Sequence, residues 1–278
     1  MKKFLNLFRT NLFLAMGIII CAVWIITAVF ANQLAPQDPL AQDISIRLQA
    51  PGGDHWFGTD SLGRDVFSRV IAGAKISIFA GLITVVSAAV IGSIYGGIAG
   101  YAGGIIDDVM MRFAEMVLAF PALILAMTIG AVLGSSLYNT LFALVIVAWP
   151  TYARIMRSVV ISIKENDYIE SSRAIGSSNM RILIHQILPN AIGSVLILAT
   201  LDIGNQILFF STLSFLGLGT PPPDPEWGSM ISAGMKNFNS WWISTFPGLG
   251  ILTMAVGANF IGDGVRDILD PKLRKNFN

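Results

Sequence analysis

Long uncharged runs, separated by segments rich in charge, dominate the pattern of hydrophobic and polar positions along the chain. A helix needs about 20 apolar residues to cross the hydrocarbon core of a bilayer. Six segments meet or approach that length, so the pattern predicts an all-α polytopic membrane protein with six transmembrane helices. Their expected ranges are 11–30, 76–98, 116–133, 137–153, 188–218 and 237–261, and the fourth extends a turn or two past Arg154.

Composition supports a membrane protein and argues against other classes. Of the 278 residues, 54% are hydrophobic and only 13% are charged, about half the charge of an ordinary soluble domain. The net charge of +1 gives no electrostatic footprint for nucleic acid. The expected surroundings are therefore a lipid bilayer, with no nucleic-acid partner.

The first apolar run could be a signal peptide or a retained helix. Lys2 and Lys3 precede it, and 29–31 (Val-Phe-Ala) could serve as a cleavage site. The run is longer than the usual core of a signal peptide, which has about 7–15 residues. We favour a retained transmembrane helix.

The distribution of Lys and Arg predicts the orientation in the membrane. If the N-terminus is cytosolic, thirteen of the 18 Lys and Arg residues fall on the cytosolic side and five on the outer side. Cytosolic loops carry the excess of positive charge, so we expect both termini in the cytosol. The expected parts are an N-terminal helix with an outer loop (1–75) and a core transmembrane region (76–278) of about five helices, the latter with a cytosolic loop at 164–187 and an outer loop at 219–239.

The cytosolic loop has the pattern of a short helix with marked ends. Asp167 can cap a helix, and Glu170, three residues later, completes a pair like a capping box. Gly176 is a good helix stop. Asn179 can start a second short helix, and Pro189 is tolerated in the first turn of the fifth span.

The short helix presents small side chains and one apolar stripe. Tyr168, Ser172 and Ile175 share one face because they lie at i, i+4 and i+7. Two interpretations stay open on this evidence. The helix could lie on the membrane surface, or it could dock into a groove on a partner protein.

Polar residues interrupt the fifth span near its middle. Asp202, Asn205 and Gln206 share one helix face. An aspartate at the bilayer centre costs about 2.5–3.5 kcal/mol on insertion scales, so it should face a cavity or a partner. We favour a face that lines a translocation pathway and meets a cationic group. The alternative is a buried hydrogen-bond network between helices.

Two further patterns concern packing. Gly96 and Gly100 form a G-x-x-x-G motif in the second span, which permits close helix approach in lipid. We favour packing within the chain over a subunit interface. Arg112 and Glu115 have the spacing of a local ion pair.

Motifs of energy-coupling or metal chemistry are missing from the sequence. It contains no G-x-x-x-x-G-K-[ST] phosphate loop and no His/Cys cluster with metal-ligand spacing. Active transport through such a chain needs its energy from a partner or from an ion gradient. We expect no metal site and no cofactor in this chain.

The cytosolic loop resembles a motif of a known family. Glu170, Gly176 and then 187–189 (Ile-Leu-Pro) follow the spacing of the Glu-Ala-Ala loop of permease subunits in binding-protein-dependent ABC importers. Ser171 and Ser172 stand where that motif has alanines, which keeps small side chains. The residues implied in coupling to an ATPase are Asp167, Tyr168, Glu170, Ser171, Ser172, Ala174, Gly176, Leu188 and Pro189.

Three other segments resemble the peptide and nickel branch of that family. They are 55–73 before the second span, 213–231 after the fifth, and 259–274 at the C-terminal end. The resemblance implies a type I ABC importer permease fold in a prokaryotic inner or plasma membrane. It also implies a second homologous permease, two cytosolic ATPase subunits that bind ATP and Mg, and an extracytoplasmic binding protein.

The resemblance leaves the substrate open between small peptides and nickel or metal chelates. In the outer loop, Pro222 and Trp227 are candidate contacts for the binding protein, although the proline run could instead form a rigid lid. The rival functions are a stand-alone secondary transporter or channel, and an intramembrane enzyme. No inverted repeat and no catalytic pair supports either of them.

Overall fold

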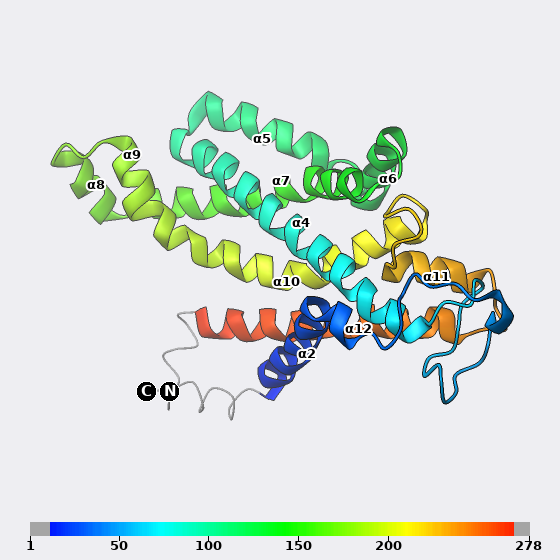
Figure 1. The fold of residues 1–278 in the computed structure, drawn as a ribbon. Coiled ribbons are helices and arrows are strands. Elements are labelled where there is room, and N and C mark those ends of the chain that lie inside the picture. Colours follow the sequence, from blue (N-terminus) through cyan, green and yellow to red (C-terminus); the bar gives the residue numbers. More distant parts are fainter. Residues whose placement is uncertain (1–11, 270–278) are drawn as a thin grey trace.

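The computed structural model describes residues 12–269 as an elongated bundle of helices (Figure 1). No β-strand occurs in this range. The predictions about the two chain ends concern residues outside it. The helical elements are α2 Leu12–Val29, α3 Ala31–Leu34, η1 Ile44–Ile46, α4 Val66–Ala102, α5 Gly104–Leu118, α6 Ala122–Leu133, α7 Leu137–Lys164, α8 Asp167–Ala174, α9 Asn179–Ile182, η2 Leu183–Ile187, α10 Leu188–Phe215, α11 Trp227–Met235 and α12 Trp242–Leu269.

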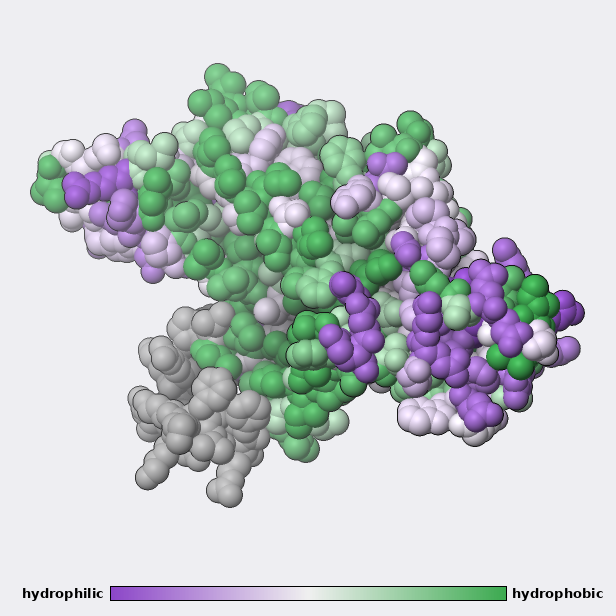
Figure 2. All heavy atoms as spheres, in the orientation of Figure 1, coloured by the Kyte–Doolittle hydropathy of each residue, from purple (hydrophilic) through white to green (hydrophobic). Residues whose placement is uncertain are grey.

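Apolar side chains cover the middle of the bundle, and hydrophilic residues gather mainly toward two opposite ends (Figure 2). One end carries α8 and α9, and the other carries α11 and the segment before α4 (Figure 1). Within residues 12–269, five helices are long and apolar enough to cross a membrane, and the number rises to six if one bent pair of helices is counted as a single span. These spans agree with the six that the sequence predicts.

The third span is broken, which differs from the single helix expected at 116–133. The bend between α5 and α6 is 84°, and it falls at 119–121. Pro121 disfavours the helical conformation of the residue before it, so α5 ends at Leu118 and α6 begins after the proline. Irregular backbone at membrane depth is tolerated where it lines a cavity or is buried in protein.

The helix pair α4 and α7 packs closely over a long contact, and a row of glycines makes this approach possible. Gly92, Gly96 and Gly100 lie on one face of α4 at i+4 spacing. A β-carbon at Gly96 would collide with the backbone of Ala153 in α7. The expected use of the G-x-x-x-G motif, packing within the chain, is confirmed.

The first helix belongs to the same bundle as the rest of the chain. Cys21 and Ala28 of α2 share a buried cluster with Met254 of α12. α4 is a continuous helix of 37 residues, about 55 Å long, and the predicted boundary at 75/76 falls inside it. That boundary therefore separates no structural unit.

One predicted ion pair is replaced by another. Arg112 and Glu115 form no ion pair in the described chain, although their spacing suits one. Asp107 of α5 instead accepts two hydrogen bonds of 2.6 Å from the guanidinium of Arg157 in α7. This bidentate pair ties α5 to α7 near the α8 end, over 50 residues of sequence.

Candidate functional site

The short helix α8 projects from one end of the bundle, as the loop sequence predicts (Figure 1). It ends at Ala174, and Gly176 in the turn that follows has a φ of 82° and donates its N–H to the carbonyl of Arg173 at 3.0 Å. That left-handed conformation suits glycine. The expected cap is wrong by one residue: Asn166 is the N-cap, and Asp167 is the first helical residue. No capping box forms, because the Asn166 side chain bonds back to Ile163 instead.

Most of the α8 surface is open. Tyr168 is 46% exposed and Ile175 just beyond the helix is 83% exposed, so the predicted apolar stripe faces outward. The hydroxyls of Ser171 and Ser172 donate to the helix's own backbone, to the carbonyls of Asp167 and Tyr168 at 2.9 Å. The small side chains therefore leave the outer face smooth. The outward face also carries the carboxylate of Glu170.

A single buried side chain, missed in the sequence, anchors α8. Ile169 is fully buried in the cluster that contains Val160 and Ile182. Beside it, Lys164 donates to the carbonyl of Tyr101 at 2.7 Å, and the Tyr101 hydroxyl donates to Asn179 at 2.8 Å. These bonds join the end of α4 to the ends of α7 and α9. The end of α7 that leads into α8 is thus tied to α4, and α4 to α9.

The entry into the fifth span is a π-helical turn. η2, Leu183–Ile187, joins α9 to α10 without a break, and the Leu188 N–H bonds to the carbonyl of Leu183. Pro189 then occupies the first turn of α10, where its missing donor is tolerated. The expected positions of Leu188 and Pro189 are confirmed as the start of α10. They lie on the α10 side of the loop rather than on α8.

In the middle of the bundle, Asp202 lies beside a cavity of about 150 Å³ between α6, α7 and α10. Its Oδ2 accepts hydrogen bonds from the Tyr152 hydroxyl at 2.9 Å and from Gln206 Nε2 at 3.0 Å. Gln206 lines the same cavity, and Asn205 is exposed on α10. Both predicted features are therefore present, a cavity face and an interhelical network.

At the opposite end, the sequence analysis missed a buried carboxylate. Glu226 is fully buried and caps α11, accepting from the N–H groups of Gly228 and Ser229 at 2.9 Å. It also accepts from the hydroxyls of Ser77 in α4, at 3.1 Å, and Ser214 in α10. Burial raises the pKa of Glu226, and the four donors oppose that shift. The Glu226 side chain thus holds α4, α10 and α11 together.

The prediction that Trp227 contacts the binding protein is wrong. Its side chain is fully buried and donates from Nε1 to the carbonyl of Val70 at 2.9 Å. It also packs edge-on against Trp24 of α2. Trp227 therefore has no surface for a binding protein here. Pro222 is exposed and lines a cavity of about 100 Å³ with Arg64 and other residues.

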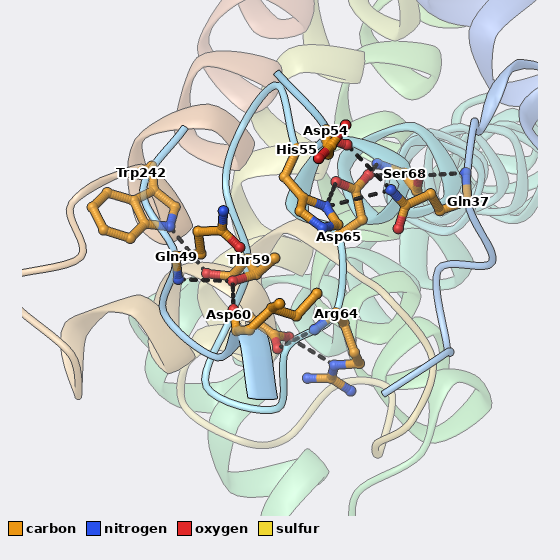
Figure 3. A network of polar contacts seen from close by, with 11 residues as sticks. Gln37, Gln49, Asp54, His55, Thr59, Asp60, Arg64, Asp65, Ser68 and Trp242 are labelled. Carbon is orange, nitrogen blue, oxygen red and sulfur yellow. Dashed lines mark hydrogen bonds and ion pairs between the residues drawn. The ribbon is translucent and has the colours of Figure 1, made fainter. Parts of the chain in front are cut away.

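The segment before α4 is an ordered cap, visible from close by in Figure 3. Asp65 caps α4: its Oδ2 accepts from the Ser68 N–H at 2.8 Å and hydroxyl at 2.7 Å. Its other oxygen lies 3.0 Å from His55 Nδ1. The Gln37 N–H donates to the Ser68 hydroxyl at 3.1 Å, which ties the start of the segment to its end.

A second set of bonds attaches this segment to α12. Trp242 donates from Nε1 to the carbonyl of Thr59 at 3.0 Å, while the Thr59 hydroxyl accepts from the Gln49 N–H at 2.8 Å. Asp60 pairs with Arg64 at 2.7 Å (Figure 3). The sequence marks this segment only by its resemblance, because its bonds join residues across the loop in no regular spacing.

A bundle of this design is that of a membrane transporter component: up to six spans in the described chain, a broken helix beside a cavity that Asp202 lines, and a projecting helix at one end. The family described as "Binding-protein-dependent transport system inner membrane component" matches residues 92–275. The chain belongs to this family.

Curated relatives are similar over nearly the whole chain. A dipeptide transport system permease protein, DppC of Alkalihalophilus pseudofirmus, is 43% identical over 96% of this chain and 88% of its own length. The probable D,D-dipeptide transport system permease protein DdpC of Escherichia coli K12 is 41% identical over 91% and 86%. The glutathione transport system permease protein GsiD of Escherichia coli O6:K15:H31 is 40% identical over 90% and 83%.

The fold is similar to that of a solved ABC importer. A chain of the MetNI methionine ABC transporter in an inward-facing conformation superimposes with a TM-score of 0.60, covering 73% of this chain and 96% of that chain. The sequence identity is 17%, so this likeness concerns the fold alone. The expected ABC importer permease fold is confirmed.

Proposed function

We propose that this chain is a permease subunit of an ATP-driven importer of small peptides. The observation that carries the proposal is α8, a short helix whose outer face is exposed and which the buried side chain of Ile169 holds at one end of the bundle. The bundle itself belongs to the family of binding-protein-dependent permeases. A second homologous permease completes the pathway, and two cytosolic ATPases bind ATP and Mg. An extracytoplasmic binding protein delivers the substrate.

In this proposal α8 is the coupling helix and lies in a cleft of one ATPase. Glu170 and Tyr168 present a charge and an aromatic ring on its open face, and Gly176 fixes the turn that follows. Closure of the ATPase pair moves α8 as a rigid body and switches the bundle between two states. The Lys164, Tyr101 and Asn179 bonds carry that movement into α4, α7 and α9.

The proposed orientation puts the α8 end in the cytosol. The inside excess of Lys and Arg supports it, and both termini then lie on the cytosolic side. The α11 end faces outward, where Pro222 beside its cavity is the remaining candidate contact for the binding protein.

Peptides are favoured over nickel or metal chelates as the substrate. Relatives at about 40% identity over most of the chain are named for dipeptide, oligopeptide and glutathione transport. A stand-alone secondary transporter or channel gains no support from these comparisons.

The test is ATPase activity of the importer, reconstituted in lipid with its binding protein loaded with a dipeptide. We expect Glu170→Ala and Gly176→Asp to reduce the binding-protein-stimulated rate by about tenfold while the assembly stays intact. Ser177→Ala is the matched control in the same loop, because only the backbone N–H of Ser177 forms a bond there, to the Ser172 carbonyl. Uptake that persists without ATP and without an associated ATPase would overturn the proposal.

A further inference from the structure

The cavity between α6, α7 and α10 contains a carboxylate with no cationic partner. In residues 12–269 the ion pairs involve Asp60, Asp65 and Asp107, and none involves Asp202. Ionisable groups at membrane depth pair with one another, face a water-filled cavity, or mark a substrate pathway. Asp202 does not pair, and it lies on the wall of a cavity.

The surroundings keep this side chain oriented toward the cavity. Tyr152 is almost fully buried, and its hydroxyl holds Oδ2 from the α7 side at 2.9 Å. Gln206 is 5% exposed and holds the same oxygen from one turn along α10. These hydrogen bonds hold the carboxyl group at the cavity wall. A carboxylate without a cationic partner is a group with which a cation can pair.

The rest of the cavity wall is mostly apolar, and its bulky members are Leu144, Val147, Leu198 and Phe209. Small side chains line it from two helices, at Ala122 and Ala126 of α6 and at Ala148 and Thr151 of α7.

We propose that Asp202 is a subsite for the ammonium group of a peptide on its way through the membrane, held by Tyr152 and Gln206 as positioning residues. The proposal rests on the proposed function and adds the part of the substrate that the pathway recognises. A charged hydrogen bond to a carboxylate is among the stronger polar contacts in proteins. A transient contact of this kind would lower the barrier that the bilayer centre poses to a zwitterion.

The experiment measures uptake of a radiolabelled dipeptide, alanyl-alanine, into liposomes that contain the complete importer, with binding protein and ATP supplied. We expect Asp202→Asn to reduce the uptake rate about tenfold or more. Asparagine keeps the size of the side chain and an oxygen that accepts from Tyr152. Asp202→Glu should restore part of the rate, because it returns the charge. Thr200→Val, on α10 but outside this cavity, is the matched control and should leave uptake unchanged.

Tyr152→Phe separates a charge role from a purely structural one. It removes the hydrogen bond and leaves the carboxylate, so the ammonium subsite predicts a much smaller loss than with Asp202→Asn. Equal losses, without rescue by Asp202→Glu, would reduce Asp202 to a member of a structural network and overturn the subsite. Uptake by Asp202→Asn at the wild-type rate would overturn it as well. Nickel-ion uptake that depends on Asp202 and needs no peptide would also overturn the ammonium subsite.

A separate readout distinguishes this failure from failure of the proposed function. ATP hydrolysis stimulated by the loaded binding protein should persist in Asp202→Asn, because α8 and its anchor are intact. If the wild-type importer itself shows neither stimulated hydrolysis nor ATP-dependent uptake, the proposed function fails before the subsite is reached.

Discussion

The two ends of the bundle differ in how their polar groups are satisfied. At the α11 end, Glu226 accepts four hydrogen bonds and Asp65 holds both His55 and Ser68, all within buried or nearly buried surroundings. In α8, at the other end, the serines bond only to their own helix, and Ile169 is the one buried side chain.

The α11 end is therefore the rigid end, whereas the α8 end has an exposed surface that a partner can cover. Buried, fully bonded polar networks fix a unique arrangement. An exposed apolar stripe beside a smooth helix face, such as Tyr168 and Ile175 on α8, is a surface that a groove can cover. Under the proposed function, the ATPase would supply the contacts that α8 lacks.

The largest effect should come from Glu226, which defines the rigid end. Glu226→Ala leaves four donors unsatisfied in a buried place, so we expect the free energy of unfolding to fall by about 3–5 kcal/mol. The measurement is the melting temperature of the importer in nanodiscs, followed by intrinsic tryptophan fluorescence. Lys236→Ala, at an exposed residue, is the control. If Glu226→Ala lowers the melting temperature no more than this control does, Glu226 does not hold the three helices together.

The next effect concerns the α4–α7 contact that links the two ends. Gly96→Leu places a side chain against the backbone of Ala153, and we expect a loss of about 2–3 kcal/mol in stability. Gly97→Ala is the control one residue away, because its β-carbon would meet only the flexible Met156 at 3.8 Å or more. Equal melting temperatures for the two variants would mean that α4 and α7 can separate without loss.

The features that could be predicted from the sequence are those that depend on spacing along the chain. The long apolar runs predict the spans, the glycine repeat predicts the α4–α7 contact, and Gly176 predicts the end of α8. Each is a local or periodic signal, carried by residues within one helix. The class of fold and the family segments follow from the same kind of evidence.

What could not be predicted depends on partners far apart in the sequence. Glu226 meets Ser77 across 149 residues, and Asp107 meets Arg157 across 50. No spacing rule selects these partners, so the local pair of Arg112 and Glu115 was expected instead. Pro121 was a visible signal for the break between α5 and α6, but the long apolar run around it favoured a single span.

The attachment of α8 to the bundle can be tested by substituting its buried residue, Ile169. Ile169→Ala removes a fully buried side chain, which costs about 2–4 kcal/mol, here felt mainly by α8. We expect faster amide hydrogen exchange over 167–174 and weaker ATPase stimulation, with the melting temperature of the bundle little changed. For the exchange measurement, Ile175→Ala is the control because that side chain is 83% exposed. Unchanged protection in the Ile169 variant would mean that other contacts hold α8.

The smallest effect is a pH dependence confined to the rigid end. Burial raises the pKa of Glu226, so the folded state binds a proton more tightly than the unfolded chain. Stability should therefore decrease as pH rises from the ordinary pKa of a glutamate to the raised value, and stay level above it. Glu226→Gln cannot titrate, so the difference in melting temperature between wild type and this variant, from about pH 4 to 8, isolates the contribution of one carboxyl group. A difference that favours the wild type increasingly as pH rises would mean that the four donors outweigh burial and that the carboxylate, rather than the acid, is the form the fold prefers.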